Sequence, residues 1–121
     1  MTAMPASEQT EGTHLIVDRF NEALNRHDVD AVMALMTPAS VFENTSPPPD
    51  GERLVGHDAV RGFWEQMFRS TPTAQVEAED IAAAGDRCVV RWQYTWTDPN
   101  GTARHIRGID VMRVRDGKVA E

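Results

Sequence analysis

Cysteine and lysine are both almost missing from this sequence. Cys88 is the only cysteine among 121 residues and Lys118 is the only lysine, so no disulfide can form within the chain. A single thiol fits a reducing compartment, and we expect a cytoplasmic protein. Cys88 lies in an apolar, β-rich stretch, where a buried and unreactive thiol is a better expectation than a nucleophile.

Basic charge and long apolar runs are scarce as well. The net charge of -7 argues against nucleic acid or an anionic membrane as a partner. No apolar run approaches membrane-spanning length. Residues 1–12 lack the basic start and apolar core of a targeting signal, and they predict a flexible polar N-terminal tail. The remaining residues, 13–121, fit one domain with room for a small-molecule cavity.

Metal ligands in a recognisable spacing are also absent from the sequence. The four histidines, His14, His27, His57 and His105, follow no ligand pattern, and no cysteine or carboxylate set completes one. No glycine-rich nucleotide motif is present either. We therefore expect neither a metal nor a cofactor.

Helical patterns fill the first part of the chain. Thr13 can cap a helix that ends near Asn25 to His27, with an apolar face made of Leu15, Ile16, Phe20, Ala23 and Leu24. Asp28 can cap a short helix over 29–36. A third helix is predicted from about His57 or Asp58 through Arg69, with Val60, Phe63, Trp64, Met67 and Phe68 on one side. Between them, residues 41–45 predict a short strand, and three consecutive prolines make 46–51 a loop.

The pattern changes to strands after Pro72. Residues 74–83, 87–97 and 103–115 predict three long strands, with turns at 85–86 and 98–101. Asp116-Gly117 is a hairpin signal, and residues 118–121 begin the next strand. Helices followed by antiparallel strands favour an α+β domain, with the helices packed on one face of a curved sheet.

Asp110 is the most informative residue of the strand half. It is the only carboxylate in the apolar run 106–112, and an unpaired carboxylate resists leaving water. Either Asp110 faces a wet or ligand-filled cavity, where apolar walls raise its pKa and suit it to proton transfer, or it has a structural partner. The residues alone leave both interpretations open.

The central strand, 87–97, has two faces of different character. Cys88, Val90, Trp92, Tyr94 and Trp96 share one face, and Arg87, Val89, Arg91, Gln93 and Thr95 share the other. Hydrophobicity alone favours the aromatic face as core and the mixed polar face as solvent-exposed.

The order of elements and four sequence segments resemble a known family. The segments are residues 19–25 (RFNEALN), 56–60 (GHDAV), 107–114 (RGIDVMRV) and 116–119 (DGKV). Over residues 13–121 the chain resembles the SnoaL-like and ketosteroid-isomerase-like branch of the nuclear transport factor 2-like fold. That resemblance implies a cone-shaped α+β domain, with three N-terminal helices packed on a strongly curved antiparallel sheet. It is less specific for an activity, since this fold hosts enzymes and non-enzymes.

The resemblance reverses the assignment of the two faces. It implies that Arg91, Gln93 and Thr95 point into the pocket, and that Trp92, Tyr94 and Trp96 lie on the outer face. An exposed aromatic stripe is an association surface, so a homodimer through these three residues is expected. The resemblance also implies a strand that continues beyond Glu121 in the biological chain.

Carry-over of known active sites is incomplete. A steroid isomerase of this fold needs a tyrosine and a carboxylate base where this chain has Phe20 and Asn44, while Asp110 matches its second acid. Classical ketosteroid isomerisation is therefore not expected. In the epoxide-hydrolase branch, Phe42 replaces a tyrosine, Asn44 and Arg91 are kept, and Gln93 replaces an aspartate. That activity would need an aspartate beyond Glu121.

The polyketide-cyclase branch requires less. There Asp110 can act as general acid and base, with Asn44 and Arg91 holding a carbonyl or enolate oxygen. The expected pocket walls are Phe20, Leu24, Phe42, Trp64, Met67, Phe68 and Met112, together with Gln93 and Thr95. Three hypotheses remain: a cofactor-independent cyclase or isomerase acting on an apolar carbonyl compound, an epoxide hydrolase variant, and a non-catalytic module that binds an apolar ligand or dimerises.

Overall fold

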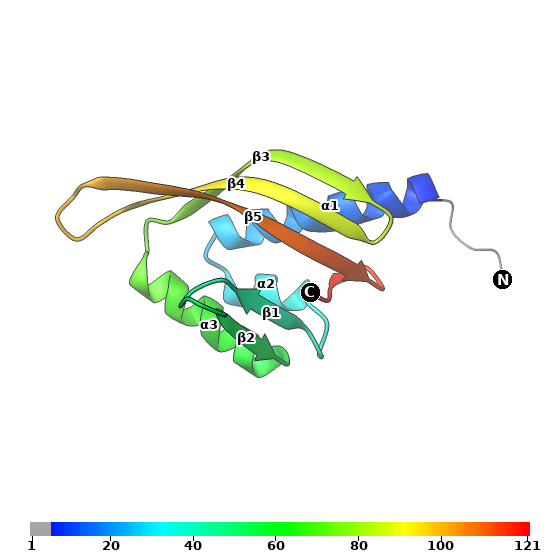
Figure 1. Ribbon diagram of the computed structural model, residues 1–121, viewed down its shortest axis with the longest axis horizontal. Coiled ribbons are helices and arrows are strands. Elements are labelled where there is room, and N and C mark those ends of the chain that lie inside the picture. The colour runs from blue at the N-terminus through cyan, green and yellow to red at the C-terminus, as the bar shows by residue number, and fades with distance from the viewer. Residues whose placement is uncertain (1–5) are drawn as a thin grey trace.

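The computed structural model describes residues 6–121 and has an α+β architecture (Figure 1). The chain runs through α1 (Ala6–Asn25), α2 (Val29–Ala34), β1 (Val41–Asn44), β2 (Glu52–Val55), α3 (His57–Ser70), β3 (Gln75–Ala84), β4 (Arg87–Thr97), β5 (Ala103–Arg115) and β6 (Lys118–Val119). Helices precede most of the strands, as the sequence predicts. The α+β expectation is therefore confirmed.

Helix α1 begins earlier than the sequence suggests. It starts at Ala6 instead of Thr13, so residues 6–12 are helical and the predicted flexible tail is corrected there; residues 1–5 lie outside the described part. The extra turns dock on the β3–β4 turn: Thr13 Oγ1 donates to the Gly85 carbonyl at 2.6 Å, and the Gly85 N–H donates to Thr10 Oγ1 at 2.9 Å. These bonds satisfy the backbone N–H and carbonyl groups of Gly85 in the turn. They also fix the first turns of α1, which the polar sequence of residues 6–12 does not by itself predict to be helical.

The buried face of α1 also differs in part from the prediction. Thr13, Val17, Phe20 and Leu24 are buried at helical spacing, whereas Leu15 is half exposed. The remaining helices form where their patterns predict. Asp28 caps α2 by accepting the Ala31 N–H at 3.0 Å, and α3 buries Val60 and Trp64.

The strands form two separate sheets. β1 and β2 make an antiparallel hairpin, and β3, β4, β5 and β6 form an antiparallel sheet in sequence order. The strand β2 is missed by sequence analysis because it is short and carries Glu52 and Arg53 beside a proline-rich loop, with no strong alternation.

The register between β4 and β5 decides which side chains face inward. Val90 pairs with Asp110, Cys88 with Met112, and Thr97 with Ala103. The connecting loop is residues 98–102, in which Asp98 Oδ1 accepts the Asn100 and Thr102 N–H groups. Because of this loop length, even-numbered residues of β4 pair with even-numbered residues of β5, and odd with odd. A register shift of one residue would turn every side chain of one strand to the other face.

The inward face of β4 is the aromatic one. Cys88, Val90 and Tyr94 are buried, and Trp92 packs against the core, whereas Arg91 and Thr95 are exposed. The hydrophobicity-based prediction is confirmed, and the reversed assignment drawn from the resemblance is wrong for this strand.

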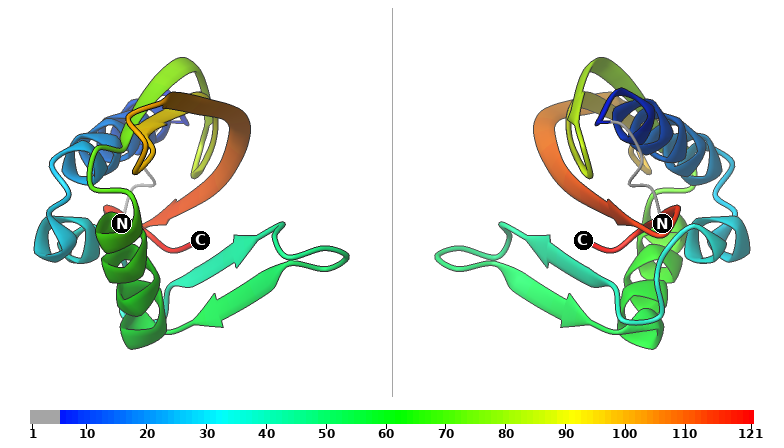
Figure 2. Two further views of the ribbon diagram at one scale, coloured as in Figure 1. Left: turned by 90° about the vertical axis from the view of Figure 1, so that its left-hand side faces the viewer. Right: turned by 90° about the vertical axis from the view of Figure 1, so that its right-hand side faces the viewer.

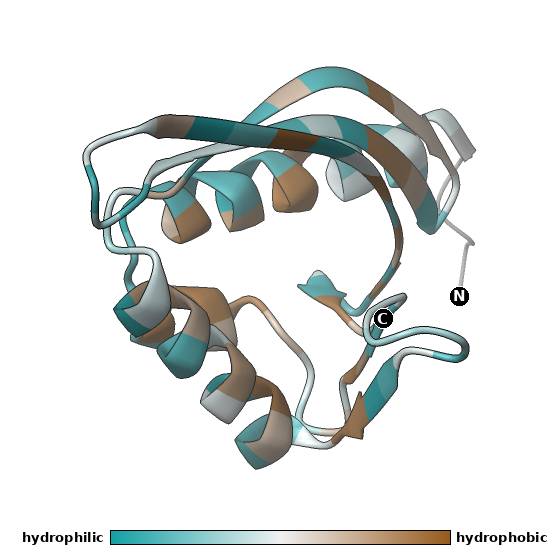
Figure 3. Cartoon of the chain, turned by 60° about the vertical axis from the view of Figure 1, so that its left-hand side comes forward, coloured by the Kyte–Doolittle hydropathy of each residue, from teal (hydrophilic) through white to brown (hydrophobic). Residues whose placement is uncertain are grey.

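The molecule has two layers that enclose an interior. The β3–β5 sheet arches over α1 on one side, and β5 curls so that its C-terminal half approaches the β1–β2 hairpin (Figure 2). Hydrophobic segments of α1 face the interior, and hydropathy alternates along β5 (Figure 3). The core joins both layers through buried residues of every helix and of β4, β5 and β6.

Candidate functional site

A cavity of about 300 Å³ lies between the curled end of β5, α1, α3 and the β1–β2 hairpin. Its volume is at the lower end of that of small-molecule sites. Four of the predicted wall residues line it, namely Phe20, Phe42, Trp64 and Met112. The apolar part of the wall is completed by Met36, Val41, Ile109, Val111 and Val119. Phe20, Phe42 and Trp64 also pack edge to face, with ring centroids 5.4 to 6.0 Å apart, so this wall is preformed.

Asp110 reaches this cavity from the middle of β5. Its register partner is Val90, and the next pair on the same face, Cys88 and Met112, is buried and apolar. Burial raises the pKa of the Asp110 carboxyl group above the ordinary 3.8, because an apolar environment disfavours the charged form. No ion pair joins Asp110 to any residue between 6 and 121.

Trp92 is the polar neighbour of Asp110. Its side-chain N–H acts against the burial effect and lowers the pKa of Asp110 in part. Trp92 Nε1 is nevertheless buried without a hydrogen-bond partner of normal geometry. The N–H group is therefore near enough to influence the carboxyl group but does not fully neutralise the cost of its burial.

Charged side chains gather where the cavity opens. Arg87 and Arg113 face each other across β4 and β5, and both line the opening with Glu43 and Glu121. Arg113 lies 3.8 Å from the Glu121 carboxylate, and Glu43 forms a 3.1 Å ion pair with Arg53 on the hairpin. The site thus combines an apolar interior, one partly buried acid and a polar entrance.

Four of the polar residues predicted for the pocket lie elsewhere. Arg91 and Thr95 are exposed on the face of β4 opposite Asp110, and Gln93 shares that face. Asn44 is at the end of β1, where its side-chain oxygen accepts the Ser46 N–H at 3.4 Å. None of the four lines the cavity. The oxygen-holding roles expected for Asn44 and Arg91 are therefore corrected.

The remaining predicted wall residues are close by but outside the cavity. Leu24, Met67 and Phe68 border a separate hollow of about 10 Å³ with Tyr94, which is too small for an organic ligand. They form part of the core beside the cavity.

The predicted dimer surface is also corrected. Tyr94 is buried and its hydroxyl group is hydrogen-bonded to Thr71 Oγ1 at 2.7 Å. Trp92 packs in the core, and Trp96 contacts the Tyr94 ring. The Trp92 and Tyr94 rings stabilise the interior, so a dimer surface formed by all three aromatic residues is not supported.

Trp92, the neighbour of Asp110, and Arg87 and Arg113, at the opening, are site residues that the sequence patterns did not predict. The length of the loop at 98–102 could have predicted all three, because it determines the β4–β5 register. That register sets Trp92 opposite Gly108, two residues from Asp110, and sets Arg87 opposite Arg113.

No set of three or more His, Cys, Asp or Glu side chains within residues 6–121 is arranged to hold a metal ion. Over the same residues, none of the helices has the length and apolar character needed to span a membrane.

Comparisons with known proteins agree with this architecture. An NTF2-like protein of unknown function from Mesorhizobium loti has 34% identity and a TM-score of 0.78, over 99% of this chain and 93% of its own. A putative polyketide cyclase from Sinorhizobium meliloti has 22% identity and a TM-score of 0.72, over 87% and 88% of the two chains. A protein from Catenulispora acidiphila with a ketosteroid isomerase-like fold, in complex with trimethylamine, has 15% identity and a TM-score of 0.76, over 87% and 79%.

The predicted nuclear transport factor 2-like fold is thereby confirmed. Comparison with curated proteins finds no match. The family model of the SnoaL-like domain matches residues 17–121, which is most of the chain. The chain therefore belongs to the SnoaL-like family.

Proposed function

We propose that the protein binds an apolar carbonyl compound in its cavity and moves a proton on that compound by way of Asp110. The observation that carries this proposal is the position of the Asp110 carboxyl group, with a raised pKa, beside the apolar wall residues of the cavity. A raised pKa brings an aspartate closer to the pH at which it can both accept and return a proton.

The chemistry needs no cofactor. The Asp110 carboxylate removes a proton from the carbon next to the carbonyl group, and the electron pair of the broken C–H bond forms an enolate. In an isomerase, the neutral Asp110 returns the proton to another carbon. In a cyclase, the enolate carbon forms a bond to a second carbonyl carbon of the same molecule, and Asp110 protonates the resulting alkoxide. Either route regenerates the carboxylate.

The walls favour a flat and apolar substrate. Phe20, Phe42 and Trp64 present ring edges and faces at about 5 to 6 Å from one another, a spacing at which aromatic ligands pack well. The similarity to a putative polyketide cyclase supports a cyclisation of this kind. Epoxide hydrolysis has less support, because Arg91 is outside the cavity.

The test is exchange of the acidic proton of an aromatic ketone. We would incubate 2-tetralone with the protein in D₂O and follow loss of the α-proton signal by NMR. The wild-type protein should accelerate exchange, and Asp110→Asn should reduce the acceleration by about 100-fold or more, the usual range for loss of a general base.

Asp80→Asn is the matched control, since it removes an exposed carboxylate from β3. It should leave the exchange rate unchanged. Binding of the ketone with no acceleration of exchange would favour the non-catalytic binding module instead. An Asp110→Asn variant as fast as wild type would remove Asp110 from the mechanism.

A homodimer remains part of the proposal, with a different surface. The face of the sheet opposite Asp110 carries Val89, Ile109 and Val111, which are 40%, 64% and 60% exposed. Ile109 and Val111 also border the cavity, so this patch adjoins the ligand site. Val89 and Val111 are register partners, so the three side chains are neighbours. A contiguous exposed apolar patch of this kind suits a second copy of the chain.

The proposed cytoplasmic location rests on Cys88, a single free thiol of the kind that fits a reducing compartment. Burial raises the pKa of this thiol, so Cys88 is a poor nucleophile.

A further inference from the structure

We propose that Arg87 and Arg113 form an anion-binding subsite at the mouth of the cavity, and that the ligand is therefore a carbonyl compound that carries a carboxylate group. This inference rests on the proposed function and narrows its substrate class from apolar ketones to keto acids.

Arg87 and Arg113 are direct register partners in the antiparallel β4–β5 pair. Side chains in such positions start about 4.5 to 5.5 Å apart at Cβ, and like charges placed there destabilise the sheet. The chain as a whole is acidic, with a net charge of -7. An acidic residue opposite Arg87 or Arg113 would remove the repulsion, yet two arginines face each other here. An unfavourable pair at a cavity mouth is explained if an anion binds between the two guanidinium groups.

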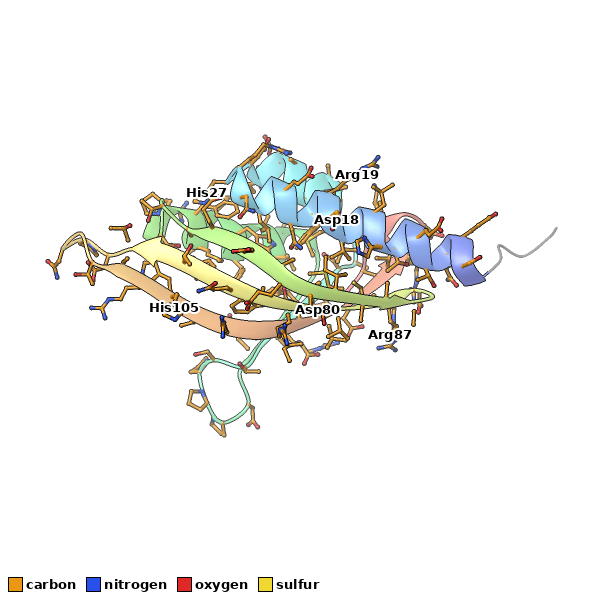
Figure 4. All side chains as sticks on the ribbon, turned by 90° about the horizontal axis from the view of Figure 1, so that it is seen from above. Asp18, Arg19, His27, Asp80, Arg87 and His105 are labelled. Atoms are coloured by element: carbon orange, nitrogen blue, oxygen red, sulfur yellow. The ribbon has the colours of Figure 1, made fainter. Side chains whose placement is uncertain are left out.

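The charges around the opening are not balanced. Glu121 lies 3.8 Å from Arg113, and Glu43 is occupied by Arg53 at 3.1 Å. Arg87 forms no ion pair with any residue between 6 and 121. Its side chain is exposed at the β3–β4 end of the sheet and points away from α1 (Figure 4). One positive charge at the opening is therefore free to bind a ligand.

Carboxylate is the chemistry that this arrangement fits. A guanidinium group presents its N–H donors in a planar fork that matches the two oxygens of a carboxylate. The neighbouring cavity wall excludes part of the water that would otherwise weaken such a pair.

The position of the subsite fixes the layout of the ligand. Arg113 is three residues from Asp110 along β5, which is about 10 Å at strand spacing. Both residues line one cavity, although their odd spacing sets their side chains on opposite faces of the strand. β5 is strongly curled in this region (Figure 2) and pairs with β6 only near its end. The carboxylate of the ligand therefore lies at the entrance while its acidic carbon lies inside, beside Asp110.

The experiment compares an acid with its methyl ester, which lacks the negative charge and is larger by one methyl group. We would measure dissociation constants of 3-benzoylpropanoate and of its methyl ester by isothermal titration calorimetry at pH 7 and low salt. Both are aromatic ketones with an enolisable carbon. The wild-type protein should bind the acid about fivefold more tightly than the ester, the effect of roughly 1 kcal/mol at a solvent-accessible ion pair. The preference should decrease in 1 M NaCl.

Arg87→Gln should abolish this preference, chiefly by weakening the binding of the acid. Arg91→Gln is the matched control, because Arg91 is on the same strand and the same face but does not line the cavity; it should keep the preference. The same measurements in Asp110→Asn protein separate binding from proton transfer, since that variant should retain the preference even where exchange is lost.

Equal affinity for acid and ester in the wild-type protein, or a preference that survives Arg87→Gln, would overturn the subsite and leave the proposed function standing. If neither compound binds at millimolar concentration, the cavity does not take aromatic ketones, and both proposals fail together. Tight binding of the acid with no proton exchange would retain the subsite and overturn only the catalytic role.

Discussion

The indole ring of Trp92 lies directly against Gly108, its register partner on β5. A Cβ atom at position 108 would stand 2.4 Å from Trp92 Cζ2 and 2.5 Å from Cη2. The glycine is required here by the close approach of a ring and not by a special backbone angle. The bare backbone lets the indole lie flat on the sheet, and its N–H then reaches the vicinity of Asp110, two residues along the same strand face.

The first prediction concerns this contact. Gly108→Ala forces the indole away and should reduce the free energy of unfolding by about 1 to 3 kcal/mol, the usual cost of overpacking. Gly62→Ala is the control, because nothing lies within 4 Å of a Cβ there and α3 should gain up to about 1 kcal/mol from better helix propensity. Urea denaturation measures both. Equal effects of the two changes would mean that the ring adapts without strain.

The second prediction concerns the indole N–H. Trp92→Phe keeps an aromatic ring but removes the group that lowers the pKa of Asp110, so this pKa should rise further above its ordinary value. Carboxyl-carbon NMR titration, with the signal assigned by Asp110→Asn, measures the change. Trp96→Phe, at the far end of β4, should leave the Asp110 titration where it is. A lower pKa in Trp92→Phe would contradict the assignment.

The third prediction concerns the dependence of stability on pH. The folded protein holds the Asp110 proton more tightly than the unfolded chain, because burial raises the folded-state pKa. Stability from this group is therefore fully present below the ordinary value of 3.8 and is lost as the pH rises through the folded-state pKa. Asp110→Asn stays neutral throughout, so it should be more stable than wild type at pH 7.

Denaturation series from pH 3.5 to pH 7 test this sign. The advantage of Asp110→Asn over wild type should shrink as the pH falls, while Asp80→Asn serves as the exposed comparison. A variant that is less stable than wild type at neutral pH would indicate that Asp110 is stabilised by a partner in its ionised form.

Much of the fold is predictable from the sequence, because periodicity and turn residues act locally. Apart from the start of α1, the three helices and the three long strands fall within about two residues of their predicted positions, since apolar spacing and the turns at 85–86 and 98–102 determine them. The helical start at Ala6 was not predictable, because it depends on bonds to Gly85 far along the chain. The strand β2 carries too few apolar residues to be recognised without its partner β1.

The site was predictable only in part. Asp110 was found because one acid in an apolar strand is conspicuous, and four wall residues followed from helix and strand faces. Arg91, Gln93 and Thr95 were misplaced because their direction depends on register, which a loop of one more or one fewer residue would invert. The hydrophobic character of Trp92 and Tyr94 predicted the correct face, and the family resemblance, which does not fix register, led away from it.

The fourth prediction concerns the outer face of the sheet. If Val89, Ile109 and Val111 form a dimer surface, Val89→Glu should place a charge in the interface and yield a monomer. Val89 is suitable because it does not line the cavity. Leu15→Glu alters an exposed apolar residue on α1 and should keep the wild-type mass. Light scattering after gel filtration measures the mass, and a monomeric wild-type protein at micromolar concentration would end the dimer proposal.

The attachment of α1 to the β3–β4 turn has a consequence for the order of folding. Thr13 and Thr10 bond to Gly85 across 72 and 75 residues of sequence, so these contacts close very long loops. Contacts of such separation carry a high entropic cost and form late, after the local hairpin that supplies Gly85. The first turns of α1 are synthesised before everything else described here, yet they should be among the last to acquire their native neighbours.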